Sequence, residues 1–180
     1  MHKDIEKLLF SEEQLSETVR SVAKQINDDY AGKQLVLVCI LKGSIMFFSD
    51  LVRNIDCDCE LEFLSASSYG SSTVSSGKVK LGEPVKSDIS GKHVLIVEDI
   101  LDTGRTLSYI KAHMESLSPK SVRICALFDK PARRCCDISA DYKGVTIEDN
   151  FIVGYGLDYN EKFRNLPYVG ILKQEIYSKK

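Results

Sequence analysis

The sequence predicts an α/β fold with a mostly parallel central sheet flanked by helices. Apolar runs of strand length, at Leu35–Leu41 and His93–Asp99, alternate with segments of helical periodicity. Both runs have a continuous apolar core, which is typical of strands buried on both faces of a parallel sheet. No internal repeat and no Pro- or Gly-rich linker divides the 180 residues, so we expect one domain over residues 1–180.

The helices are predicted from their start signals and their apolar periodicity. A first helix follows Ser11, because Ser11 and Gln14 match a capping box, and Gly32 is a typical stop. A second helix is predicted over Ile45–Val52, and a third begins at Thr106. The apolar face of the third helix is predicted to consist of Leu107, Ile110, Met114 and Leu117. Further strands are predicted at Leu61–Ala66, Ser121–Phe128, Phe151–Tyr155 and Tyr168–Leu172.

A serine-rich segment follows the predicted strand at Leu61–Ala66. Residues 65–78 contain seven serines and two glycines, too little apolar surface to hold the segment in one conformation. We interpret residues 68–80 as a flexible active-site loop that closes as a lid and excludes water. The alternative is a hairpin tip without a function.

Composition and charge exclude several classes of protein. The net charge of -2 provides no large positive field for recruiting nucleic acid. No apolar run approaches the ~20 residues of a membrane span, and the N-terminus lacks the features of a signal peptide. The six cysteines lack zinc-site spacing. We therefore expect a cytoplasmic protein with reduced thiols, no structural metal, and neither nucleic acid nor membrane as partner.

Polar pairs follow three of the predicted strands directly. They are Lys42–Gly43, Glu98–Asp99 and Asp129–Lys130. Open α/β sheets bind ligands at the carboxyl edge of their strands. The three pairs are therefore predicted to meet in one site.

The loop from Asp102 to Thr106 has the features of a phosphate cradle. Its small residues Thr103 and Gly104 let backbone N–H groups approach an anion, and the following helix contributes its positive end. The Walker lysine pattern and the dinucleotide pattern G-x-G-x-x-G are both absent. The acids Glu98 and Asp99 just upstream suit sugar hydroxyls or a hard cation such as Mg²⁺. A cradle next to these acids predicts a ribose phosphate ligand, although strand-end acids alone are more often simply solvated.

The segment VLIVEDILDTGRTL, residues 94–107, resembles the phosphoribosyl-pyrophosphate (PRPP) motif of type I phosphoribosyltransferases. The segments LKGS, SSYG, LFDKPARR and FIVGYGLDYNEKFRNLPYVGIL are similar, in order and spacing, to the hypoxanthine(-guanine) phosphoribosyltransferases. The similarity covers about residues 35–172, and GYGLDYNEKFRNLPYVG is its most specific part. It implies the type I fold, with a small hood formed by N- and C-terminal segments.

The resemblance also implies an activity. Enzymes of this family transfer the phosphoribosyl group from PRPP to a 6-oxopurine in purine salvage. Hypoxanthine or guanine then gives IMP or GMP, with pyrophosphate as second product and Mg²⁺ as cofactor. A homodimer or homotetramer is implied as well. The choice between hypoxanthine and guanine stays open, and xanthine is an alternative base. A second alternative is a regulator that uses the fold to sense PRPP or bind nucleic acid, against which the net charge and the intact acids weigh.

Individual roles follow from the matched motifs. Asp102 is implied as the general base for the purine N7 proton, with helix capping as the alternative. Lys130 is implied to bind the 6-oxo group, Phe151 to stack on the purine, and Ile152 to contact the base through its main chain. The implied metal ligands are Glu98, Asp99 and Asp158. The implied substrate-binding residues are Lys42, Gly43, Ser68, Tyr69, Glu98, Asp99, Asp102, Thr103, Gly104, Arg105, Thr106, Lys130, Phe151, Ile152, Asp158 and Arg164.

Among these, Lys42, Gly43 and Arg164 are implied to bind pyrophosphate. In the family, the peptide bond before the lysine is often cis. Arginine suits a pyrophosphate because its planar guanidinium carries a fork of donors.

Overall fold

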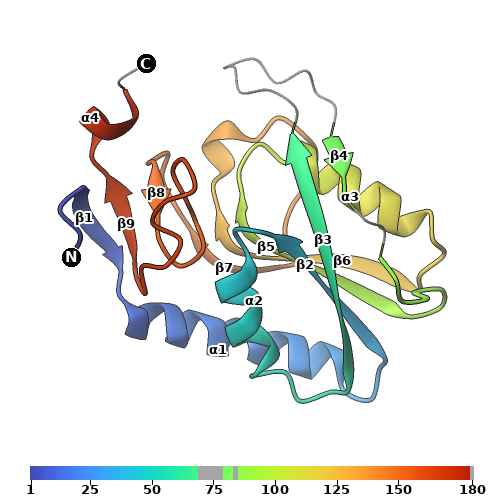
Figure 1. Cartoon of the computed structure of the whole chain (residues 1–180). Helices are drawn as coiled ribbons and strands as arrows, with labels where there is room; N and C mark the ends of the chain where they lie inside the picture. The colour runs from blue at the N-terminus through green and yellow to red at the C-terminus, as the bar shows by residue number, and fades with distance from the viewer. Residues whose placement is uncertain (69–78, 83–84, 179–180) are drawn as a thin grey trace.

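The computed structural model describes residues 1–68, 79–82 and 85–178. Its elements alternate along the chain much as the sequence predicts (Figure 1). In order they are β1 Ile5–Phe10, α1 Glu12–Tyr30, β2 Leu35–Leu41, α2 Ile45–Val52, β3 Cys59–Ser68, β4 Val79–Leu81, β5 His93–Leu101, α3 Arg105–Glu115, β6 Ser121–Asp129, a 3-10 turn Pro131–Arg133, β7 Tyr142–Thr146, β8 Ile152–Val153, β9 Val169–Leu172 and α4 Gln174–Tyr177.

The larger sheet has the strand order β4-β3-β2-β5-β6-β7. Strands β3, β2, β5, β6 and β7 are parallel, and only β4 pairs antiparallel, at the edge. The central strands β2 and β5 are buried along most of their length, which confirms the prediction, made from their apolar runs, that both are buried strands of a parallel sheet. Because the strands run parallel, the residues that follow β2, β5 and β6 lie at one edge of the sheet.

Helices cover both faces of this sheet (Figure 1). Alternate residues of β2 point to opposite faces, as the two-residue period of a strand requires. Leu37 belongs to the core that α1 and α2 close, whereas Val38 belongs to the core closed by α3. Burial on both faces therefore makes the central strands a rigid base for the loops at their ends.

A second, antiparallel sheet of three strands has the order β1-β9-β8. It joins the N-terminal segment to the C-terminal one, so the predicted hood is confirmed (Figure 1). The predicted strands Phe151–Tyr155 and Tyr168–Leu172 belong to this sheet and are shorter than predicted. Four short elements, β1, β4, β7 and α4, were not predicted from the sequence.

Several predicted boundaries are confirmed and others are corrected. The capping box of α1 is present, with Ser11 N donating to Gln14 Oε1 at 2.9 Å and Gln14 N to Ser11 Oγ at 3.3 Å. Strand β5 continues two residues beyond Asp99. Leu117 was wrongly assigned to the buried face of α3; it is 40% exposed because the helix ends at Glu115.

The predicted lid falls largely on residues 69–78, which lie outside the described residues. Its flanks are strands, since Ser68 of β3 pairs with Val79 of β4. Within the described part of the chain, none of the helices combines the length and the apolar character that crossing a bilayer requires.

We expect Leu95→Ala to lower the free energy of unfolding by about 2–5 kcal/mol, because Leu95 is fully buried in β5 and its loss leaves a cavity. Leu117→Ala, at an exposed position, is the matched control and should change this free energy by about 0.5 kcal/mol or less. Equilibrium denaturation by urea measures both. Equal effects of the two variants would contradict the assignment of the core.

Candidate active site

Two adjoining cavities lie at the carboxyl edge of the larger sheet. The first, of about 210 Å³, is lined by the loop after β5, and the second, of about 480 Å³, contains Lys42, Glu161 and Arg164. Leu41 and Ala66 line both of them. The predicted convergence is thereby confirmed for the ends of β2 and β5, whereas the third pair, Asp129–Lys130, lines neither cavity.

The loop between β5 and α3 forms one wall of the first cavity. Thr103, Gly104 and Thr106 line it, together with the first turn of α3. Gly104 has φ +84°, and a Cβ there would lie 2.5 Å from Ile138 Cγ2, so only glycine fits. Arg105 does not line this cavity; its Nε donates to Cys135 Sγ at 3.2 Å. The cavity therefore faces small residues and the positive end of a helix, which suits an anion.

Asp102 lines the same cavity and has an unsatisfied acceptor. Its Oδ1 is buried and has no hydrogen-bond partner among the described residues. Its Oδ2 lies 3.4 Å from Arg133 Nη1. Buried polar atoms are nearly always hydrogen-bonded, so this acceptor at a cavity wall is placed to accept from water or from a ligand.

Arg134 holds the main chain at the start of the loop between β5 and α3. Its Nε donates to Asp102 O at 2.8 Å and its Nη2 to Leu101 O at 2.9 Å. The same guanidinium pairs with Asp129 at the end of β6. No pattern in the sequence singled out Arg134. The only signal was its place in the segment LFDKPARR, just after a strand end.

The acids Glu98 and Asp99 form a closely coupled pair. Glu98 lines the first cavity, and Asp99 is 9% exposed and packs against Gly43. Burial raises the pKa of Glu98 well above its ordinary value, and the charge of Asp99 adds to the rise. Burial also raises the pKa of Asp99. Two buried carboxyls of this kind favour either a shared proton or a bound cation.

Across the described residues, no three His, Cys, Asp or Glu side chains are grouped so that they could hold a metal ion by themselves. Asp158, the third acid predicted as a metal ligand, pairs with Arg164 Nη2 at 2.9 Å and accepts from Glu161 N at 2.8 Å. The structure thus does not gather Glu98, Asp99 and Asp158 into one three-carboxylate group.

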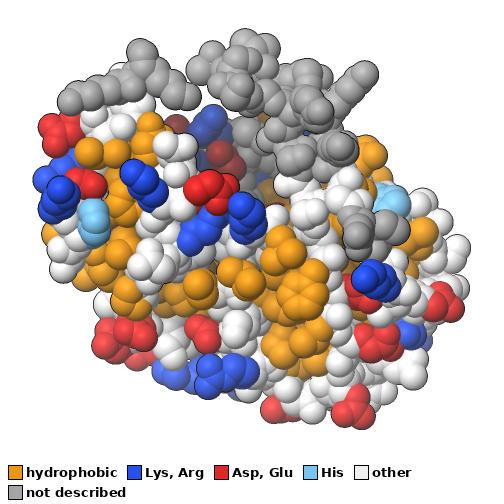
Figure 2. Space-filling model, viewed as in Figure 1, with side chains coloured by type: hydrophobic (Ala, Val, Ile, Leu, Met, Phe, Trp, Pro, Cys, Tyr) orange, Lys and Arg blue, Asp and Glu red, His pale blue; other side chains and the backbone are white. Residues whose placement is uncertain are grey.

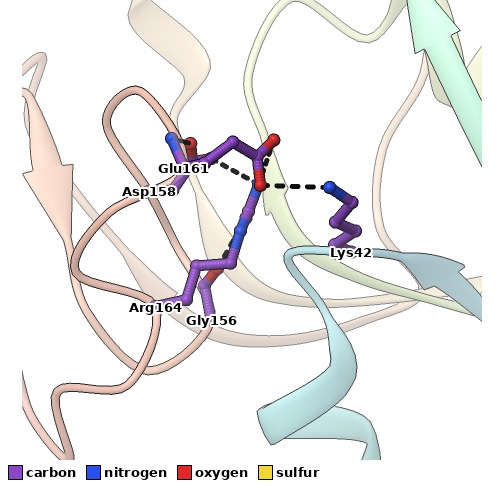
Figure 3. Close-up of polar contacts among 5 residues, drawn as sticks. All are labelled: Lys42, Gly156, Asp158, Glu161 and Arg164. Carbon is purple, nitrogen blue, oxygen red and sulfur yellow. Dashed lines mark hydrogen bonds and ion pairs between the residues drawn. The ribbon is translucent and has the colours of Figure 1, made fainter.

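Two cations meet at the second cavity (Figure 3). Lys42 follows β2, and the peptide bond between Leu41 and Lys42 is cis, as the resemblance implied. Lys42 Nζ lies 3.1 Å from Glu161 Oε2. Arg164 comes from the loop before β9; its Nη1 donates to Gly156 O at 2.8 Å, and its Nε is buried without a partner among the described residues.

The loop between β8 and β9 has a strained backbone. Tyr155, Asn160, Glu161 and Phe163 all have positive φ although none is glycine. Each such residue costs about 1–3 kcal/mol, and strain of this kind concentrates at functional sites. The loop packs so closely on the loop after β2 that a Cβ on Gly156 would lie 1.9 Å from Gly43 O.

The residues predicted to bind the base lie beside the hood. Lys130 is buried, with Nζ 3.0 Å from Asp149 Oδ1 and 3.4 Å from Asn150 O. Phe151 is 38% exposed, so it is not a core residue. Its ring stacks on Tyr177 at a centroid distance of 4.8 Å. Ile152 is buried in β8.

Two predicted residues begin the segment predicted as a lid, residues 68–80. Ser68 ends β3, and its side chain lies outside the described part of the structure. Tyr69 lies outside the described residues altogether.

Comparison with known proteins identifies relatives over nearly the whole length. The family of the phosphoribosyl transferase domain matches residues 9–160. The hypoxanthine-guanine phosphoribosyltransferase of Streptococcus thermophilus is 49% identical over 179 residues, 99% of each chain.

Solved structures agree with this relation. The crystal structure of a hypoxanthine phosphoribosyltransferase from Staphylococcus aureus has a TM-score of 0.94 at 47% identity, covering 98% of this chain and 96% of that one. A hypoxanthine-guanine phosphoribosyltransferase from Bacillus anthracis, with a HEPES molecule in its active site, has a TM-score of 0.90 at 47% identity, covering 94% and 99%. The chain therefore belongs to the phosphoribosyltransferase family, and within it to the hypoxanthine-guanine phosphoribosyltransferases.

Proposed function

We propose that this enzyme joins hypoxanthine or guanine to the phosphoribosyl group of PRPP, giving IMP or GMP and pyrophosphate in purine salvage. The observation that carries the proposal is the pair of adjoining cavities. One is lined by a helix N-terminus with small residues, and the other by Lys42 and Arg164. PRPP has the matching charge pattern, with one phosphate on the ribose 5-position and a pyrophosphate on C1.

In this arrangement, the loop from Asp102 to Thr106 holds the 5'-phosphate through backbone N–H groups and threonine hydroxyls. Glu98 accepts hydrogen bonds from the ribose hydroxyls, and Asp99 supports it. The guanidinium of Arg164 and the ammonium of Lys42 hold the pyrophosphate. The unpaired Arg164 Nε supports this assignment, because a buried donor needs an acceptor that the described residues do not supply.

We propose Mg²⁺ as the cofactor. The donor set fits, since Glu98, Asp99 and Asp158 offer the carboxylate oxygens that Mg²⁺ prefers. Mg²⁺ commonly binds through one or two carboxylates plus substrate phosphates. That mode agrees with the absence of a three-ligand group among the described residues. When bound, the ion neutralises charge on the pyrophosphate leaving group.

The base is assigned to the region of Lys130 and Phe151. The Lys130 ammonium donates to the purine 6-oxo oxygen, which disfavours a 6-amino purine because that group offers a donor instead. Phe151 stacks on the base, a contact worth about 1–3 kcal/mol for bases on aromatic side chains. Ile152 contributes main-chain contacts at the hood.

Asp102 acts as the general base. It removes the proton from N7 of the purine while the purine forms its bond to ribose C1 and the bond from C1 to pyrophosphate breaks. Its unpaired Oδ1 supports this role, because the proton to be removed supplies the missing donor. Arg133 Nη1, 3.4 Å from Oδ2, helps to orient the carboxylate.

We also propose a homodimer or homotetramer working in the cytoplasm. Figure 2 shows hydrophobic side chains gathered on the face over α2 and β3. Large apolar residues are exposed there, at Ile45, Met46, Leu61 and Phe63. Exposed patches of this kind support contact between subunits, which sedimentation equilibrium tests. All six cysteines are free, which supports a reducing compartment.

The function is tested by supplying PRPP and Mg²⁺ with hypoxanthine, guanine, xanthine, adenine or uracil in separate reactions, and measuring pyrophosphate release. We expect release with hypoxanthine or guanine and none with adenine or uracil. Release with xanthine alone would change the assigned base. PRPP binding without release for any base would favour a PRPP sensor.

We expect Asp102→Asn to lower kcat by about 10²–10⁴-fold while PRPP still binds, because an amide cannot accept the N7 proton. Steady-state kinetics and calorimetric titration with PRPP measure the two effects. Asp137→Asn, the same change at an exposed acid, is the control. Near-normal turnover of Asp102→Asn would eliminate Asp102 as the base.

Arg134→Lys should lower kcat/KM for PRPP by about 10- to 100-fold. A single ammonium cannot bind Leu101 O, Asp102 O and Asp129 together as the planar guanidinium does. The loop between β5 and α3 would then shift, and a small shift of a substrate-binding loop lowers the rate by about this factor. Arg53→Lys, at a 78% exposed side chain, is the control. Circular dichroism establishes that both variants are folded. An unchanged kcat/KM in folded Arg134→Lys would show that the fork does not position the loop.

A further inference from the structure

A single carboxylate bridges the two cations of the second cavity. Glu161 Oε2 lies 3.1 Å from Lys42 Nζ, and Glu161 Oε1 lies 3.5 Å from Arg164 Nη2. Lys42 and Arg164 belong to segments far apart in the sequence, and Figure 3 shows Glu161 between them. All three line the same cavity. The carboxylate oxygens thus occupy positions at which oxygens of a bound pyrophosphate would have to lie.

Glu161 leaves part of the binding capacity of the cations unused. Arg164 Nε stays buried without an acceptor among the described residues, although Glu161 and Asp158 both contact Nη2. A two-oxygen carboxylate therefore satisfies this site incompletely. A pyrophosphate carries more acceptor oxygens and more charge, and it fits the remaining donor better.

The bridge is also built to open. The side chains of Lys42 and Glu161 are 68% and 64% exposed, so water and salt screen their attraction. The hydrogen bond from Lys42 lowers the pKa of Glu161 from its ordinary value, so the group is an anion at neutral pH. The backbone of Glu161 is held separately, because its N–H donates to Asp158 Oδ2 at 2.8 Å. The side chain can leave Lys42 while the loop keeps its shape.

We propose that Glu161 is an internal anionic competitor that holds Lys42 and Arg164 when no ligand is bound, leaves Lys42 when pyrophosphate or the pyrophosphate group of PRPP enters, and returns to assist product release. The inference rests on the proposed function, which assigns pyrophosphate to Lys42 and Arg164. Its consequence is that Glu161 weakens pyrophosphate binding and shortens the lifetime of the product complex.

The test is calorimetric titration of the full chain with inorganic pyrophosphate in the presence of Mg²⁺. Glu161→Gln keeps the size of the side chain and removes its charge, so it should lower the Kd for pyrophosphate by about two- to fivefold, the range expected for one exposed ion pair. Glu17→Gln makes the same charge change at an exposed position on α1 and should leave the Kd unchanged.

A double-variant comparison separates competition from a general charge effect. In a Lys42→Gln background the carboxylate has lost its main partner, so Glu161→Gln should change the Kd much less than it does in the native chain. An equal change in both backgrounds would overturn the competitor role, because it would reflect only the lost negative charge.

The outcomes also separate this inference from the proposed function. If Arg164→Gln weakens pyrophosphate binding but Glu161→Gln weakens it or leaves it unchanged, the competitor role is wrong and the pyrophosphate site stands. If neither Lys42→Gln nor Arg164→Gln alters the Kd, the proposed pyrophosphate site is itself wrong, and the inference fails with it.

Discussion

The site depends on a close approach at Gly43, where the Asp99 side chain of β5 and the backbone of the loop before β9 both reach the loop after β2. A Cβ on Gly43 would lie 1.8 Å from Asp99 Oδ2, and a Cβ on Gly156 would lie 1.9 Å from Gly43 O. A side chain at position 43 would displace the Asp99 carboxylate, and one at position 156 would clash with the backbone of the loop after β2. This contact places Lys42, the acid pair and Arg164 around one opening.

The charged groups of the site are paired in a way that leaves specific buried atoms without a hydrogen-bond partner among the described residues. Two of the three buried side-chain atoms without a partner in the described residues, Asp102 Oδ1 and Arg164 Nε, belong to the site. Asp102 Oδ1 is an acceptor at the first cavity, and Arg164 Nε is a donor at the second cavity. Native interiors rarely tolerate such atoms, so their concentration here indicates positions that a ligand completes.

The strained loop between β8 and β9 is held by what surrounds it. Strands β8 and β9 pair with each other, β1 pairs with β9, and Gly154 N donates to Leu157 O at 3.0 Å. The hood therefore stabilises four non-glycine residues at positive φ, including Glu161, against their conformational cost. A rigid main chain with an exposed acidic side chain is the combination that the proposed exchange between Glu161 and pyrophosphate requires.

The sequence by itself determined the buried strands, the capping box of α1 and the small-residue loop before α3, because apolar periodicity and small residues at a helix start are local signals. It also located Asp102, Lys130 and Arg164 through motifs. Only the tertiary structure decided that Arg134 anchors the loop between β5 and α3. The same holds for the contacts by which Glu161 joins Lys42 to Arg164, and for the pairing of β1 that completes the hood. These contacts join segments distant in the chain, where no local spacing relates the partners, and exposure such as that of Phe151 depends on how the segments pack.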